Sequence, residues 1–204
     1  MKVNFNLIAP IYDLLSSLVY GKELIRAQVE FLNKIPKKSK VLVIGGGTGK
    51  FLESLDKLGR AMDLVYLEAS SSMLKRAKSR APFENLSIDF QLGTQEDIKG
   101  DFDVIITFFF LDLFTEASLK VISTSLYKHL KKEGIWLFAD FCKTETFWQQ
   151  WLVKIMYTFF RVVSGIEASH LLNLPQHLSN LPLAQLQQKH FFHGMVASYV
   201  FRKS

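Results

Sequence analysis

The segment Lys40–Phe51, with the sequence KVLVIGGGTGKF, limits what this chain can fold into more than any other stretch. Val41–Ile44 is an unbroken apolar run, which is typical of a strand buried on both faces of a parallel sheet. The glycine-rich residues 45–49 follow it, and residues 50–55 then have helical spacing. A strand, a glycine turn and a helix start together predict a place where the backbone approaches a nucleotide-like ligand.

The spacing of the glycines indicates which ligand this is. The dinucleotide fingerprint G-x-G-x-x-G would need its third glycine where this chain has Lys50, one residue after Gly49. Gly45-x-Gly47-x-Gly49 resembles motif I of the class I S-adenosylmethionine-dependent methyltransferases. This resemblance implies S-adenosylmethionine as cofactor and S-adenosylhomocysteine as product, with the three glycines admitting the amino-acid end of the cofactor.

An acidic residue follows at the interval where such folds bind ribose. Residues 64–67 read as a second strand that ends at Glu68, about 20 residues past the glycines. The alternative is an ordinary surface glutamate. The segment with Glu68, Ala69 and Met73 also resembles the methyltransferase segment after motif I, which implies that Met73 packs beside adenine, unless it is simply a core residue.

Two later strand ends complete the predicted cofactor site. A third strand, 86–92, leads to Gly93, after which related proteins usually carry an acid where this chain has Thr94. Contact with adenine then comes from the Thr94 hydroxyl, the Gln95 backbone or the Glu96 side chain, or adenine is held less tightly. The fourth strand, 102–111, resembles motif IV, which implies that Thr107 and Phe108 border the methionine end.

Two residues are candidates for acid–base chemistry. Asp112 follows the fourth strand, where related enzymes often have histidines, and it could serve as a general base, hold a polar group of the substrate, or cap the helix 116–131. Tyr12 belongs to an N-terminal segment that resembles the entry segment of ubiquinone/menaquinone-biosynthesis-type methyltransferases. Its hydroxyl either faces the methyl group or a substrate oxygen, or the ring packs at the domain edge.

The alternation of strands and helices predicts an α/β fold. We expect a Rossmann-like, doubly wound, mostly parallel seven-stranded sheet with an antiparallel last strand, right-handed crossovers, an N-terminal helical cover and an inserted helix after the fifth strand. In this interpretation Lys131–Gly134 forms the turn between a helix and the fifth strand, 135–141. The whole chain, 1–204, is one domain, with the cover at 1–35, the cofactor-binding core at 36–142, a lid at 143–182 and a terminal hairpin at 183–204.

The predicted inserted helix begins after Thr144 and ends near Ser164. Its apolar residues are spread too widely for one narrow stripe, so we expect two buried faces. One face packs on the core, and the other lines an apolar pocket or contacts a partner or a membrane. The alternative is a helix that packs on the core and has no functional role. We therefore name Trp148, Trp151 and His170 as candidate substrate residues, and we expect a small lipophilic acceptor that is quinone-like or phenolic.

Composition and charge narrow the classes of function. The chain has 204 residues, of which 49% are hydrophobic. Its net charge of +6 is dispersed along the sequence, which argues only weakly for binding to nucleic acid. The basic residues could equally bind an acidic substrate, contact an anionic membrane surface or simply be solvated. Cys142 is the single cysteine, which excludes an intrachain disulfide and a thiolate zinc cluster and fits the cytoplasm. The histidines lack ligand spacing, so no metal is expected. The sequence leaves the oligomeric state open.

Three other classes of protein compete with a small-molecule methyltransferase. A dinucleotide-dependent dehydrogenase would share the fold and the ribose acid but not this glycine spacing. A non-catalytic domain that binds S-adenosylmethionine for scaffolding or regulation would have the same glycine motif. A nucleic-acid methyltransferase would fit the basic charge but usually carries an Asn/Asp-Pro-Pro-Tyr/Phe signature where this chain has Phe-Phe-Phe-Leu-Asp.

Overall fold

The structure of the protein is a computed structural model, and it describes residues 22–144, 146–164 and 170–204. The strands are β1 (Lys40–Ile44), β2 (Met62–Glu68), β3 (Leu86–Leu92), β4 (Phe102–Phe108), β5 (Leu130–Phe141), β6 (Leu183–Phe191) and β7 (Val196–Lys203). The α-helices are α2 (Glu23–Val29), α3 (Leu52–Asp56), α4 (Ser71–Lys78), α5 (Glu116–His129), α6 (Phe147–Ser164) and α7 (Leu174–Leu178). Single 3-10 turns are η2 (Leu32–Lys34), η3 (Gln95–Asp97), η4 (Leu111–Leu113) and η5 (Phe192–Gly194).

The strands form one seven-stranded sheet in the order β3-β2-β1-β4-β5-β7-β6. Strands β1 to β5 pair in parallel, whereas β7 is antiparallel to both β5 and β6. The order reverses at β1, which pairs with β2 on one side and β4 on the other. In open α/β sheets ligands bind at the carboxyl ends of the strands beside such a reversal. The predicted fold class, with its antiparallel last strand, is confirmed.

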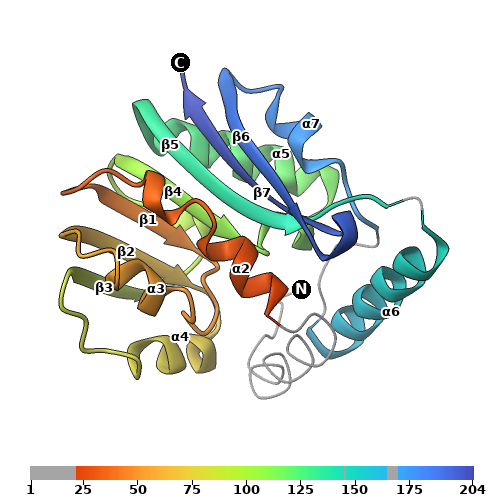
Figure 1. Ribbon diagram of the computed structural model, residues 1–204, viewed down its shortest axis with the longest axis horizontal. Helices are drawn as coiled ribbons and strands as arrows, with labels where there is room; N and C mark the ends of the chain where they lie inside the picture. Colours follow the sequence, from red (N-terminus) through yellow and green to blue (C-terminus); the bar gives the residue numbers. More distant parts are fainter. Residues whose placement is uncertain (1–21, 145, 165–169) are drawn as a thin grey trace.

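Helices cover both faces of this sheet (Figure 1). Helices α2, α3 and α4 bury their apolar faces against one side of the strands, and α5 and α7 bury theirs against the other. The central strand β1 is buried on both faces, since Val41–Ile44 are each at most 2% exposed. The unbroken apolar run therefore has the place that its pattern predicted.

Two local predictions were wrong. The predicted turn at Lys131–Gly134 lies inside β5, because α5 already ends at His129 and β5 begins at Leu130. The pairing with β4 shifts register between Phe102↔Leu130 and Val104↔Ile135, so these residues form an irregular stretch of the strand. The helix indicated by the spacing of residues 50–55 begins two residues later, since α3 spans Leu52–Asp56.

The insert after β5 is not a lid throughout. Helix α7 lies within the predicted lid 143–182, but Leu174 is 1% exposed and Leu178 is fully buried in the cluster beneath α5. Asn173 caps this helix by accepting a hydrogen bond from the Gln176 N–H. This part of the insert therefore belongs to the core. The hairpin of β6 and β7, joined through η5, follows it as predicted.

Candidate functional site

The glycine turn after β1 is built around positive φ angles. Gly45, Gly47 and Gly49 have φ values of 65°, 62° and 68°, a region that residues with a Cβ rarely adopt. A Cβ on Gly45 would lie 2.3 Å from a ring carbon of Phe110, whereas one on Gly47 would meet, among the described residues, only the sulfur of Met73, at 3.8 Å. Gly45 is therefore required for packing, and within the described part of the chain Gly47 leaves room for a ligand to approach the backbone.

Glu68 at the end of β2 is tied to this turn. Its Oε2 accepts a hydrogen bond from the Gly47 N–H at 2.9 Å, and its Oε1 accepts one from the Ser70 N–H at 2.8 Å. The residue is only 5% exposed, and burial raises the pKa of its carboxyl group, partly offset by these backbone donors. A surface glutamate is thereby excluded. A carboxylate has about four lone-pair sites, so capacity remains to accept hydroxyl groups of a ligand.

Neighbouring residues hold this unit in place. The Tyr66 hydroxyl donates to the Gly47 carbonyl at 3.0 Å, and the Ser70 hydroxyl accepts from the Met73 N–H at 3.3 Å to cap α4. Met73 is 6% exposed and lies beside Gly47, and its contact with adenine stays a prediction, while Ala69 is exposed between Glu68 and Ser70. Tyr66 was not named from the sequence, because a tyrosine within a buried strand gives no sign of this contact.

The loop after β3 is closed by local hydrogen bonds. The carboxylate of Asp97 accepts from the Thr94 N–H at 2.8 Å, and the Thr94 hydroxyl accepts from the Glu96 N–H at 3.4 Å. Thr94 and Asp97 thus form the capping box of η3. Gln95 is half-buried and Glu96 is exposed. Asp97 is an acid that lies close to Gly93, because its Oδ2 would be 2.7 Å from a Cβ added to that glycine.

Thr107 and Phe108 at the end of β4 point to opposite faces of the sheet. Thr107 is fully buried and its hydroxyl accepts a hydrogen bond from the Trp136 indole at 3.0 Å, so its side chain belongs to the core and not to a ligand surface. Phe108 is 6% exposed and packs edge-on against Phe51, which directly precedes α3, with ring centroids 5.2 Å apart.

Asp112 lies in η4 beside a second buried acid, Asp140, near the end of β5. Asp140 Oδ2 accepts from the N–H groups of Leu111 and Asp112, at 3.2 and 3.3 Å, and Oδ1 accepts from the Phe141 N–H at 2.9 Å. Asp112 is 5% exposed and Asp140 1%. Burial, then the neighbouring Asp112 carboxyl and a hydrogen bond to it, raise the pKa of Asp140 well above its usual range. Asp112 and Asp140 therefore form a buried pair of interacting carboxyl groups.

The proposed capping role of Asp112 was wrong. Helix α5 is capped by Thr115, whose hydroxyl accepts from the Ser118 N–H at 3.3 Å. Asp140 was not named as a site residue, although an apolar strand that ends in an acid was a signal for it. Phe110, two residues before Asp112, packs on Gly45 of the glycine turn.

The candidate substrate residues are exposed. Trp148 and Trp151 lie on α6 with 47% and 60% exposure, and His170 is exposed. Tyr12 lies outside the described residues. In the described part of the chain, no group of three or more His, Cys, Asp or Glu side chains gathers as a metal site would require.

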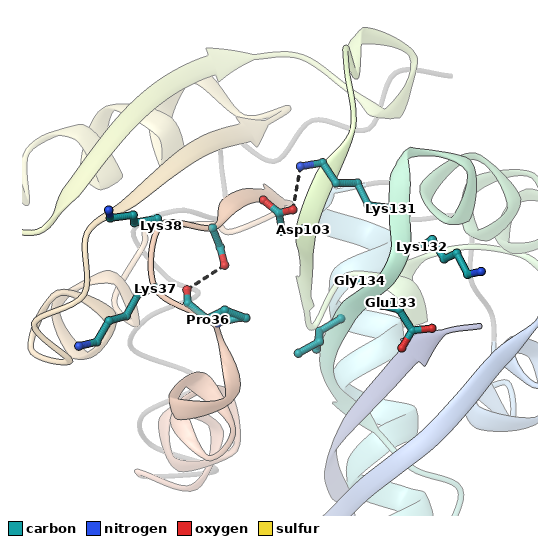
Figure 2. Close-up of a pocket in the computed structure, with 10 residues that line it drawn as sticks. Pro36, Lys37, Lys38, Asp103, Lys131, Lys132, Glu133 and Gly134 are labelled. Atoms are coloured by element: carbon teal, nitrogen blue, oxygen red, sulfur yellow. Dashed lines mark hydrogen bonds and ion pairs between the residues drawn. The ribbon is translucent and has the colours of Figure 1, made fainter.

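A cleft of about 310 Å³ lies at the opposite edge of the sheet (Figure 2). It is lined by Pro36–Ser39 and Lys131–Ile135, with Asp103 between them at the start of β4. Lys131 pairs with Asp103 at 2.7 Å, while Figure 2 shows Lys37 and Lys38 directed away from Lys132. The lysines do not converge, so we place no ligand there.

Comparisons with known proteins agree with this geometry. A family model described as a methyltransferase domain matches residues 41–134. The chain is 28% identical to the carboxy-S-adenosyl-L-methionine synthase of Nautilia profundicola, over 68% of this chain and 61% of that protein. It is 30% identical to the ubiquinone biosynthesis O-methyltransferase of Bartonella tribocorum, over 55% of this chain and 44% of that protein. The chain thus spans less than two thirds of the length of these relatives.

Solved structures show the same fold. A chain from the complex between the Haloferax volcanii Trm112 methyltransferase activator and a putative methyltransferase matches with a TM-score of 0.71 and 13% identity, covering 99% of this chain and 98% of that one. Magnesium protoporphyrin IX methyltransferase from Synechocystis PCC 6803, with bound S-adenosylhomocysteine, matches with a TM-score of 0.68 and 11% identity, covering 98% and 96%.

The class that this fold and this glycine–acid arrangement define is the class I S-adenosylmethionine-dependent methyltransferases, whose cofactor is S-adenosylmethionine. Residues 41–134 match the family described as a methyltransferase domain.

Proposed function

We propose that the protein transfers a methyl group from S-adenosylmethionine to a small lipophilic acceptor that is quinone-like or phenolic. The observation that carries this proposal is the buried carboxylate of Glu68, bonded to the backbone of Gly47 at the shared carboxyl edge of β1 and β2. The open space over Gly47 and the adjacent Met73 fit a nucleoside with an attached amino acid. The apolar residues of α6 and the similarity to a ubiquinone biosynthesis O-methyltransferase support a lipophilic acceptor.

Each residue of the site would have a distinct task. Glu68 would accept the ribose hydroxyls, Gly47 would let the backbone approach the amino-acid end, and Met73 would contact the adenine. When bound, S-adenosylmethionine supplies an electrophilic methyl group on a sulfonium. Because the chemistry needs little covalent help, positioning of the acceptor is the protein's main contribution, and such proximity effects reach about 7–11 kcal/mol.

Asp112 would take the proton that the acceptor hydroxyl loses as its oxygen bonds to the methyl carbon. The pair of Asp112 and Asp140 suits this task, because two carboxyl groups that hold one proton retain one basic site. This role is supported by the position of Asp112 after β4, in a segment whose Phe110 packs on Gly45.

Calorimetric titration with S-adenosylhomocysteine tests the cofactor, with NADH as the competing ligand. We expect micromolar binding of S-adenosylhomocysteine and none of NADH. Preference for NADH, or no binding of either, would refute the proposal at its first step.

Transfer of a labelled methyl group from S-adenosylmethionine to a panel of lipophilic phenols and quinols tests the reaction. Incorporation into at least one of them is expected, and it should fall when Asp112 is replaced by Asn. Tight binding without transfer to any acceptor, or transfer only to nucleic acid, would instead favour the alternatives of a non-catalytic binding domain or a nucleic-acid methyltransferase.

A further inference from the structure

Helix α6 exposes large apolar side chains on one face. Phe147 is 82% exposed, Trp148 47%, Trp151 60% and Ile155 44%. Phe147, Trp151 and Ile155 are spaced four residues apart, and Trp148 is three residues before Trp151, so the four side chains lie on the same side of the helix. We call these four residues the aromatic face.

The opposite side of α6 attaches the helix to the body of the protein. Gln149 is 3% exposed and its Nε2 donates to the His193 carbonyl of η5 at 3.0 Å, while Val153 is 8% exposed within the main apolar cluster. Trp148 also packs edge-on against Phe192 with ring centroids 6.3 Å apart. The helix is thus fixed by one side, and the aromatic face is turned to the solvent.

The charge of α6 favours an anionic occupant for this face. The helix contains Lys154 and Arg161 and no acidic residue, and the chain carries a net charge of +6. Lys154 is exposed and lies beside Ile155. Exposed Trp and Phe together with basic residues on an amphipathic helix are typical of helices that lie in the interface of a membrane. No helix in the described ranges is long and apolar enough to cross a bilayer.

We propose that the aromatic face of α6 docks the protein onto the surface of an anionic lipid bilayer, with the helix lying in the plane of the interface. Figure 1 shows α6 beyond the end of β5, at the edge of the sheet toward which the parallel strands point. The glycine turn and Glu68 follow strands that end at this same edge. Docking would therefore bring the ligand site close to lipid-soluble acceptors. Docking through the aromatic face does not require methyl transfer. Its link to a lipophilic acceptor rests on the proposed function.

Tryptophan fluorescence gives a direct test, because Trp148 and Trp151 are exposed while the third tryptophan, Trp136, is fully buried. Vesicles of phosphatidylcholine with phosphatidylglycerol should shift the emission of the full-length protein to shorter wavelength, and the protein should sediment with them. Replacing Trp151 by Gln should weaken sedimentation by about tenfold or more. The matched control is Val121→Gln, which removes a side chain of 68% exposure from α5 and should bind vesicles like the wild type.

Three results would overturn the proposal. The first is that the folded protein does not sediment with anionic vesicles, and the second is that Trp151→Gln and Val121→Gln sediment equally well. The third is a dimer, seen by light scattering in the absence of lipid, that Trp151→Gln dissociates, because the aromatic face would then bind a second copy of the chain. Binding of S-adenosylhomocysteine, measured on each variant, keeps this test separate from that of the proposed function.

Discussion

Gly47 and Glu68 are joined by a hydrogen bond of 2.9 Å from the Gly47 N–H to Glu68 Oε2, which makes the turn after β1 and the end of β2 one rigid unit. Residues that are 21 positions apart in the chain thus present a backbone edge and a carboxylate to the same space. The first two predictions concern this unit.

Replacing Glu68 by Gln should lower the affinity for S-adenosylhomocysteine by roughly 10- to 150-fold, because hydrogen bonds to a charged group contribute about 1.5–3 kcal/mol. The measurement is calorimetric titration at one pH and salt concentration. Asp63→Asn is the matched control, since Asp63 is an exposed acid near the other end of the same strand. Equal affinity in wild type and Glu68→Gln would show that Glu68 does not contact the ligand.

Gly47→Ala and Gly45→Ala should fail in different ways. An added Cβ at Gly47 meets ordinary contacts, so the cost in folding stability is that of the positive φ, roughly 1–2 kcal/mol, while ligand affinity should drop at least tenfold. At Gly45 the Cβ collides with the Phe110 ring, so about 1–3 kcal/mol of overpacking is added. Urea unfolding and ligand titration of both variants measure the contrast, and the reverse ranking of their stabilities would contradict it.

The pair of Asp112 and Asp140 should make folding stability depend on pH. The pKa of Asp140 is raised in the folded state, so its stabilising contribution is complete below the unfolded pKa of about 3.9 and is lost as pH rises through the folded pKa. The free energy of unfolding of the wild type should therefore decline above about pH 4. Asp112→Asn removes the neighbouring acid and lowers the pKa of Asp140, so this decline should become shallower.

Denaturant unfolding at a series of pH values measures this effect as the difference between wild type and Asp112→Asn. The groups that face Asp140 include Asp112 and, toward β7, Cys142 and Tyr199, whose protonated forms carry no charge. Asp101→Asn removes an exposed acid and serves as the control. Parallel pH profiles for wild type and Asp112→Asn would show that the two carboxyl groups are not coupled.

Cys142 should react slowly in the native protein. Burial raises the pKa of its thiol to about 11, with only partial compensation from the Tyr199 hydroxyl 3.7 Å away. At pH 8 the thiolate fraction is then on the order of a hundredfold below that of a free cysteine with a pKa of about 8.5. Because this is the single cysteine, reaction with a chromogenic disulfide reports on it alone. Equal rates with and without denaturant would contradict a half-buried, protonated thiol.

The sequence by itself determined the frame of this protein. The apolar run Val41–Ile44 could only be a strand covered on both faces, and the glycines after it could only be a turn of positive φ, since these properties depend on local sterics and on which residues avoid water. The positions of Glu68 and Asp112 after strand ends followed from the same periodicity, because the carboxyl ends of parallel strands meet at one edge.

Tertiary structure decided what those residues contact. Sequence showed Asp112 as an acid ahead of a helix, yet Thr115 caps that helix and Asp112 meets Asp140, which lies 28 residues away on the next strand. The Thr107 hydroxyl likewise meets Trp136 of β5, which lies 29 residues away. Local propensity indicates which kind of element forms, but a buried polar group must find a partner, and only the packing of strands that are distant in sequence determines which partner that is.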